Sequence, residues 1–332
     1  MLHGTSLASA ATFTTIALPE MDRYGYEKGF SLAGIASAGT LAALIPPSAM
    51  MVIYCIFTDV SIGRVLIAGI LPGILTMGLF ICAVIFSVQL KPSLAPAAAE
   101  NVSLQEKLKA AKLILPLLPV AVVVLGGIYF GIFTATEAGA TGAFTGFIMF
   151  IIRNRNQKNN ILPLTRDAMK GAARTTSMIF IIIVGAFVYS RFLSVSGVMS
   201  AISTFMTGLP LPPKIVVGII LLIIMFLGTF LEAVAILALT MPIFFPIIMK
   251  LGVDPVWFGI LVVMMIEIGV LTPPLGTNIF VIKAASKSIG YEISLEEIFG
   301  GLLPFFLMYV LSVIIILIFP DIALWLPGMM MD

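Results

Sequence analysis

The chain has few of the residues on which catalytic and metal chemistry depends. It contains one histidine, His3, and two cysteines, Cys55 and Cys82, among 332 residues. Both cysteines lie in apolar stretches, where a buried free thiol is the ordinary state and a disulfide is not indicated. The apolar stretches also lack a spaced His/Glu pair and a Ser/Lys or His/Asp set. The sequence therefore argues against a metalloenzyme or a hydrolase, and we predict that the chain is not an enzyme.

Charge is equally scarce. Asp, Glu, Lys and Arg make up 10% of the residues, while hydrophobic residues make up 60% and the mean hydropathy is +1.17. These values lie far outside the range of soluble domains. The net charge of +2 and the lack of a basic, aromatic-rich surface give no reason to expect a nucleic-acid partner. The composition predicts a multi-pass membrane protein.

The two halves of the chain repeat each other. Pro19 matches Pro246 and Gly25 matches Gly252, both at a spacing of 227 residues. The same spacing relates the Pro-Pro pairs Pro46-Pro47 and Pro273-Pro274. After a slip of five residues the match resumes, with 69–72 against 301–304. A long repeat that places Pro and Gly inside hydrophobic sequence is typical of secondary transporters.

Charge asymmetry predicts the orientation. Lys and Arg collect in two linkers, 91–112 and 153–174, whereas the connection 131–142 has neither, so we expect both linkers to be cytoplasmic. We expect 172–192 to be an arm-like helix that does not cross the membrane. Between the starts of the last helices of the two repeats, the expected crossings are then Ile62–Leu90, 113–133, 138–152, 215–227 and a broken span around Pro273. Five crossings are an odd number, so the repeats are expected to be inverted.

Each repeat contains a segment suited to a re-entrant hairpin, followed by a broken helix. The segments 4–22 and 228–250 are apolar and end in proline and a polar tip, although an ordinary packed helix is an alternative for each. The spans 33–57 and 257–284 must unwind at their Pro-Pro pairs. Unwound carbonyls with nearby Ser, Thr and Asn oxygens suit Na⁺, and the helix start after each break favours an anion.

Two carboxylates, Glu232 and Glu267, stand inside apolar runs. An acid in such a position is costly and is usually paired, protonated or functional.

Taken together, these motifs resemble the large membrane subunit of TRAP (tripartite ATP-independent periplasmic) transporters, the DctM-like family. The resemblance extends over essentially the whole chain. It is carried by Gly4-Thr5-Ser6, 18–21, Gly39-Thr40, 45–48, Leu231-Glu232, 240–242, 267–269 and 271–278. Residues 134–138 are similar to that family's Thr-Pro-Thr-Glu-Ala element, with Ala135 in place of the proline.

The resemblance implies an all-α polytopic membrane protein of the elevator type, with inverted repeats, two re-entrant hairpins and two Pro-Pro-broken helices. It implies Na⁺-driven import of an organic acid, such as a dicarboxylate, a sialic-acid-like acid or a keto acid. The implied partners are a small four-helix membrane subunit and a periplasmic binding protein, and the implied location is the bacterial inner membrane. No cofactor is implied beyond Na⁺ as the coupling ion.

The resemblance also implies site residues. A first Na⁺ site would be formed by Gly4, Thr5, Ser6, Gly39, Thr40 and Pro46. A second would be formed by Thr272, Gly276, Thr277 and Asn278, to which we add the two membrane-embedded acids Glu232 and Glu267. Substrate would lie between the hairpin tips and the breaks, near Pro47, Ser48, Thr240 and Pro274.

We expect four parts: a first transport part at 1–90, a cytoplasmic linker at 91–112, scaffold and arm helices at 113–227, and a second transport part at 228–332. Because 137–227 has no counterpart before Gly4, we expect ~90 in-frame residues upstream of Met1, with about three apolar segments. Two other functions stay open: a Na⁺/carboxylate carrier of the same architecture that needs no binding protein, and a membrane scaffold that does not transport.

Overall fold

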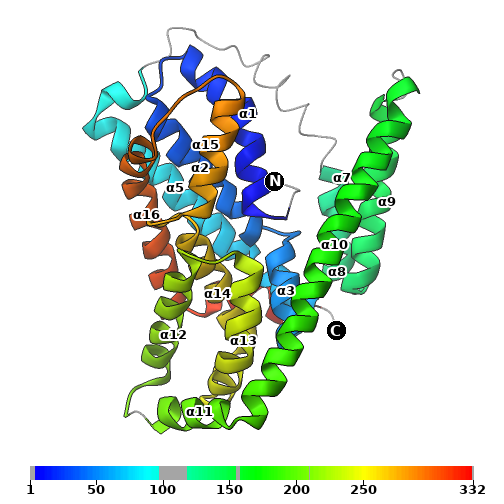
Figure 1. The fold of residues 1–332 in the computed structure, drawn as a ribbon, viewed down its shortest axis with the longest axis vertical. Coiled ribbons are helices and arrows are strands. Elements are labelled where there is room, and N and C mark those ends of the chain that lie inside the picture. Colours follow the sequence, from blue (N-terminus) through cyan, green and yellow to red (C-terminus); the bar gives the residue numbers. More distant parts are fainter. Residues whose placement is uncertain (1–3, 97–117, 155–157, 209, 331–332) are drawn as a thin grey trace. The chain divides into compact units, whose positions relative to one another are not determined.

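The computed structural model describes residues 4–96, 118–154, 158–208 and 210–330, and every regular element in these ranges is helical (Figure 1). The chain divides into two compact units. One comprises Met1–Glu100 and Ala201–Met329, and the other comprises Asn101–Ser200 with Met330–Asp332. The expected linker 91–112 lies outside the described residues from 97 onward.

The first unit contains both repeats. Its first half has α1 (Ser6–Arg23), α2 (Lys28–Leu44), α3 (Ala49–Thr58), α4 (Ile62–Ala68), α5 (Ile70–Leu90) and the short η1 (Pro92–Leu94). Its second half has α11 (Val198–Gly208, which begins at the unit boundary), α12 (Pro213–Gly228), α13 (Ala233–Lys250), α14 (Pro255–Gly269), α15 (Thr277–Ser288), α16 (Leu295–Ile318), α17 (Asp321–Leu324) and η4 (Pro327–Met329).

The second unit is smaller. It has α7 (Leu118–Ala121), which continues through the π-helical turn η3 (Val122–Gly126) into α8 (Gly127–Tyr129), then α9 (Ala135–Asn154) and α10 (Lys158–Val195). The start of α9 is a capping box, because the Thr134 N–H donates to Glu137 Oε2 at 2.8 Å and the Glu137 N–H donates to Thr134 Oγ1 at 3.3 Å. The 134–138 element therefore has a local structural role.

The sequence repeat reappears as a repeat of helices and turns. α1 and α13 each have 18 residues, and they begin at matching positions of the two repeats. The turns that follow use Gly25 and Gly252 in the left-handed region, with φ of 75° and 69°. Glu27 then caps α2 and Asp254 caps α14, and each carboxylate accepts from backbone N–H groups two and three residues further on. Equivalent residues therefore stop and restart the helices in the same way.

Both predicted helix breaks are confirmed. α2 and α3 are separated by residues 45–48 and meet at an angle of 44°. α14 and α15 are separated by residues 270–276. Both Pro-Pro peptide bonds, Pro46-Pro47 and Pro273-Pro274, are cis. The interruptions are where two successive residues without N–H donors prevent the helix from continuing.

The two broken helices run in opposite directions, which confirms the inverted repeat. The Tyr54 hydroxyl on α3 donates to the Pro255 carbonyl at the start of α14 at 2.7 Å. At the other end, the Lys28 ammonium group at the start of α2 lies 5.2 Å from the ring centre of Tyr291, just after α15. The repeats also exchange contacts, since α1 packs on α15 while α13 packs on α3 (Figure 1).

The expected hairpin segments have a different form. Residues 6–23 and 233–250 are each one continuous helix, so neither reverses direction within itself. The reversal in the second repeat is the turn at 229–232, which joins α12 to α13 as a helical hairpin. Both helices contain proline, Pro19 in the first and Pro242 and Pro246 in the second, and each helix continues past it. That such a hairpin is re-entrant remains a prediction.

Two segments have lengths that differ from those expected. The segment 172–192, expected to be a non-crossing arm, belongs to the 35-residue apolar stretch Ile161–Val195, which is long enough to cross. The 38 residues of α10 extend about 57 Å at 1.5 Å per residue. α12, expected to cross, has 16 residues and extends about 24 Å, less than the ~30 Å of hydrocarbon. By length and composition the described residues include five spans, or six if α2 and α3 count as one.

Candidate functional site

The start of α1 lies against the first helix break. The Gly4 carbonyl accepts a hydrogen bond from the Ala49 N–H at 3.0 Å. Gly4 has a φ of 65°, and a Cβ there would lie 3.3 Å from the Pro47 carbonyl oxygen. Thr5 precedes α1 without capping it through its side chain. The structure therefore brings the predicted residues Gly4 and Pro47 together.

The predicted first-site residues Pro46, Gly39 and Thr40, and the predicted substrate-region residue Ser48, lie beside this contact or one helix away. Pro46 is buried, and the buried Ser48 donates to the Ala43 carbonyl and accepts from the Met51 N–H at 3.3 Å. On α2, a Cβ at Gly39 would lie 3.1 Å from Ala10 Cβ, so α1 and α2 approach closely. The next residue, Thr40, is fully buried and donates to the Ser37 carbonyl at 2.7 Å.

A buried carboxylate joins the two repeats. Glu267, on α14, is 1% exposed, and its Oε1 accepts from Ser6 Oγ at 3.1 Å. Its Oε2 is buried and has no hydrogen-bond partner. Neither of the two ion pairs found in the described part of the chain includes this carboxylate. A buried carboxylate without a compensating cation is strongly unfavourable, so Glu267 is either protonated or balanced by a bound cation.

Four more unpartnered polar atoms accompany it. In the described ranges, the other buried side-chain atoms without a partner are Ser9 Oγ, both amide atoms of Asn278 and the Tyr309 hydroxyl. Ser9 lies one turn after Ser6 on α1. The Asn278 N–H donates at 3.1 Å to the carbonyl of Val270, one turn after Glu267. Tyr309, on α16, lies close enough to Glu267 and to Thr40 of α2 to interact with both side chains.

We call Ser6, Ser9, Glu267, Asn278 and Tyr309 the buried polar cluster, because Ser6 and Tyr309 interact with Glu267, Ser9 follows Ser6 by one turn, and the Asn278 backbone is bonded one turn after Glu267. Four helices supply it, and its side chains offer hydroxyl, amide and carboxylate oxygens, which are ligands for hard cations. It holds a single carboxylate, and no group of three His, Cys, Asp or Glu residues occurs among the residues described. When ionised, the cluster carries one negative charge, which suits a monovalent cation better than a divalent one.

The break between α14 and α15 is more exposed than the break between α2 and α3. Thr272 donates to the Ile268 carbonyl at 2.7 Å, while Pro274 is exposed. Gly276 is buried with a φ of 56° and precedes α15, and Thr277 is half-buried. Asn278 is therefore the one fully buried polar side chain on this part of the chain.

Two predicted residues serve their own helix. Glu232 is exposed and caps α13, accepting from the Val234 N–H at 2.9 Å. Thr240 is buried on α13 and donates to the Ile236 carbonyl at 2.7 Å. Neither forms a hydrogen bond with the buried polar cluster, but the Glu232 carboxylate lies close enough to Glu267 to interact with it electrostatically.

The cluster differs from the predicted division into two sites. Ser6 was expected in the first Na⁺ site and Glu267 in the second, yet a hydrogen bond joins them. Sequence reasoning also missed Ser9 and Tyr309. Ser9 had a usable signal, its spacing of three from Ser6 on one helix face. Tyr309 had none, because an aromatic residue in an apolar helix looks like ordinary packing.

The chain is similar to known transport proteins along nearly its whole length. The family model described as "Tripartite ATP-independent periplasmic transporter, DctM component" matches residues 1–322. The C4-dicarboxylate TRAP transporter large permease protein DctM of Pseudomonas aeruginosa is 35% identical over 327 residues, covering 98% of this chain and 74% of that protein. Its counterpart of the same name in Vibrio cholerae is 33% identical over 347 residues, with 99% and 75% covered. The sialic acid TRAP transporter large permease protein SiaM of Vibrio cholerae is 26% identical, with 98% and 74% covered. The chain therefore belongs to the DctM family, the large permease component of the tripartite ATP-independent periplasmic transporters.

Proposed function

We propose that this chain moves a small organic acid across the bacterial inner membrane by Na⁺-coupled secondary transport. The observation that carries the proposal is the buried Glu267 carboxylate, which accepts from Ser6 of the other repeat and forms no ion pair with any described residue. A bound Na⁺ supplies the missing charge. Because its ligands come from both repeats, ion binding favours one arrangement of the two repeats, and that preference couples the ion to substrate movement.

The names of the relatives indicate a class of substrate and not a single compound. Relatives are named for C4-dicarboxylate, sialic acid, isethionate and ectoine. We infer a small organic acid that lies near the breaks, where Ser48 and the start of α15 offer polar groups and a helix N-terminus for an anion. A periplasmic binding protein would deliver it, a small four-helix membrane subunit would complete the permease, and an elevator movement would carry it across.

The ion assignment is tested by removing single ligands. In the full-length permease, reconstituted with its small subunit and binding protein, Ser6→Ala and Asn278→Ala are each expected to raise the Na⁺ concentration for half-maximal uptake. A hydrogen bond to a charged group is worth ~1.5–3 kcal/mol, so Ser6→Ala should raise it roughly tenfold or more.

Uptake at saturating Na⁺ should partly recover in both variants, because excess ion compensates for weaker binding. Expression and binding-protein docking should stay near normal. If both variants keep the native Na⁺ dependence, or if uptake is equal with Na⁺ absent, the assignment of these residues to a Na⁺ site is wrong. Uptake that proceeds without the binding protein would instead support the binding-protein-independent carrier.

We also propose an orientation. The Glu27 N–H donates to the Leu94 carbonyl at 2.9 Å, and Lys28 lies over Tyr291, so the segments after α5 and after α15 lie at one end of the first unit. Lys91, Lys283 and Lys287 lie near this end, and the positive-inside rule makes it cytoplasmic.

The opposite end contains the start of α12. The Lys214 ammonium group donates to the Ile318 carbonyl at 3.1 Å, and the Trp257 N–H donates to the Ile316 carbonyl at 2.9 Å, so α12 and α14 both begin where α16 ends. That end is periplasmic. The same rule assigns the basic linker 153–174 to the cytoplasm, so the chain between this linker and α12 crosses the membrane once, and α10 is the apolar helix long enough to do so. The hairpin of α12 and α13 then enters and leaves on the periplasmic side.

Cysteine labelling tests this orientation. In a background without Cys55 and Cys82, Ser196→Cys, directly after α10, and Thr136→Cys are expected to react with a membrane-impermeant maleimide in intact cells. Ser93→Cys in η1 should react only after permeabilisation. The same cytoplasmic pattern is predicted for positions 107 and 155, which lie outside the described residues. If position 196 does not react in intact cells, the result would support the alternative in which 172–192 is an arm that does not cross the membrane.

A further inference from the structure

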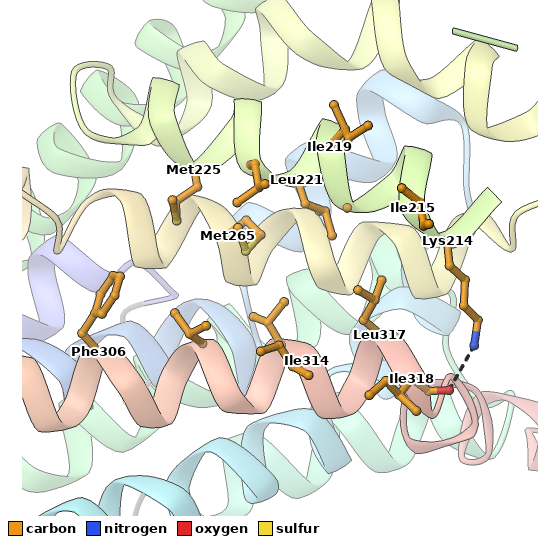
Figure 2. Close-up of a pocket in the computed structure, with 14 residues that line it drawn as sticks. Lys214, Ile215, Ile219, Leu221, Met225, Met265, Phe306, Ile314, Leu317 and Ile318 are labelled. Atoms are coloured by element: carbon orange, nitrogen blue, oxygen red, sulfur yellow. Dashed lines mark hydrogen bonds between the residues drawn. The ribbon is translucent and has the colours of Figure 1, made fainter. Parts of the chain in front are cut away.

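A long apolar groove runs along the first unit between α12, α14 and α16, with a volume of about 740 Å³ (Figure 2). α12 and α16 form its two walls, and Met265 of α14 lies between them. Met225 and Phe306 lie toward one end, and Lys214 and Ile318 lie at the other (Figure 2). The groove is open along its length, since wall residues such as Leu222 and Ile314 are 57% and 45% exposed.

The groove has one charge, at one end. Lys214 is the only charged residue in its lining. The Lys214 ammonium group donates one hydrogen bond, to the Ile318 carbonyl at 3.1 Å, and an ammonium group has two further protons to donate. The positive end of the α12 dipole, at Pro213, lies beside the negative end of the α16 dipole, at Ile318, so the Lys214 ammonium group is the net positive feature of this end. This end of the groove therefore attracts an anion, while the rest accepts only apolar groups.

Neighbouring residues place the charged end at the membrane surface. Trp325 follows α17 shortly after Ile318 and is 57% exposed, as expected of an aromatic residue at the boundary between lipid and water. Lys214 is exposed at the end of an apolar helix, where its side chain reaches the headgroup level. In the orientation proposed above, this is the periplasmic surface.

We propose that this groove is a binding site for an anionic phospholipid, with an acyl chain between α12 and α16 and its phosphate at Lys214. The proposal goes beyond the transport function and does not depend on Na⁺ coupling. The shape and the charge both support it: the apolar walls match a hydrocarbon chain, and the single cation at the surface end matches a phosphodiester. A second groove of about 420 Å³ between α1, α2 and α5 has no charged residue in its lining, so nothing identifies its occupant.

The test is a lipid titration of the purified full-length protein, followed by native mass spectrometry. Dioleoylphosphatidylglycerol is expected to bind about fivefold more tightly than dioleoylphosphatidylcholine, because one Lys near the surface contributes about that factor. Lys214→Gln should remove the preference. Arg64→Gln, an exposed cation at the start of α4 outside the groove, should retain it. Equal affinity of the native protein for the two lipids would overturn the proposal, as would a preference that survives Lys214→Gln.

Filling the groove gives a second test that does not depend on charge. Gly218 lines the groove, and a Cβ there would meet no atom within 4 Å, so Gly218→Leu should fold normally and exclude the acyl chain. Binding of the phosphatidylglycerol should fall at least severalfold. Gly300→Leu on α16 is the matched control, because that position is equally open and lies outside the groove. Undiminished binding in Gly218→Leu would overturn the proposal, as would crosslinking of Gly218→Cys to a polypeptide instead of to lipid.

Discussion

Glu267→Gln is expected to raise the Na⁺ concentration for half-maximal uptake by roughly 100-fold or more. Glutamine keeps the shape of the side chain and can still bond to Ser6, but it removes the only carboxylate of the buried polar cluster. Separating a buried charge from its partner costs about 3–5 kcal/mol, and 1.4 kcal/mol corresponds to a factor of ten. The loss should therefore exceed that caused by Ser6→Ala, which leaves the charge in place.

Uptake by reconstituted permease over a range of Na⁺ concentrations measures this effect. The matched control is Glu296→Gln, which removes an exposed carboxylate in the first turn of α16. It should leave the Na⁺ dependence unchanged. If Glu267→Gln transports with the native Na⁺ dependence, the carboxylate is not part of the ion site, and the Pro-Pro breaks with their carbonyls become the remaining candidates.

Gly301→Leu is expected to destabilise the first unit by ~3 kcal/mol or more. α2 and α16 touch through their backbones: a Cβ at Gly301 would lie 2.8 Å from the Gly29 carbonyl oxygen and 2.9 Å from Phe30 Cα. Backbone atoms cannot move aside as a side-chain tip can, so a larger residue must push the helices apart. Overpacking commonly costs 1–3 kcal/mol, and this contact involves two helices at once.

The residue one position earlier is an internal control. Gly300 is on the same helix, and a Cβ there would meet no atom within 4 Å. Gly300→Leu should preserve stability or raise it slightly, because leucine favours a helix over glycine by up to about 1 kcal/mol. Thermal unfolding followed by size-exclusion chromatography in detergent compares the two. Equal midpoints for Gly300→Leu and Gly301→Leu would show that α2 and α16 do not need this close contact.

Local features of the fold were predictable because they depend on residues adjacent in sequence. Two prolines in succession break a helix whatever surrounds them, and both breaks occur where predicted. The 227-residue register predicted equivalent helices, and α1 and α13 match in length and position. The inverted arrangement followed from an odd count of crossings. The opposite directions of the two broken helices agree with it. In the orientation that we propose, 172–192 crosses the membrane in place of 215–227, and this exchange leaves the number of crossings odd.

Hydropathy and charge patterns did not establish which of the segments 172–192 and 215–227 crosses the membrane. An apolar helix that crosses a bilayer and one that lies along it or returns have similar composition, so 172–192 was not distinguishable from an arm. Likewise, the sequence offers two polar positions at which the chain of the second hairpin could reverse, one near residue 250 and one at 229–232. Packing of α12 on α13 decides between them, and packing is not visible in a single sequence.

The sequence by itself determined that this protein is a helical membrane transporter built from a repeat, because composition, prolines and glycines act locally. Only the tertiary structure decided which polar residues meet. Ser6 and Glu267 are 261 residues apart, and their hydrogen bond exists because the inverted repeats bring α1 beside α15 and α14 beside α16. The same packing leaves Ser9, Asn278 and Tyr309 buried without partners. A residue's burial and its missing partner are properties of all the helices around it, and no local pattern contains them.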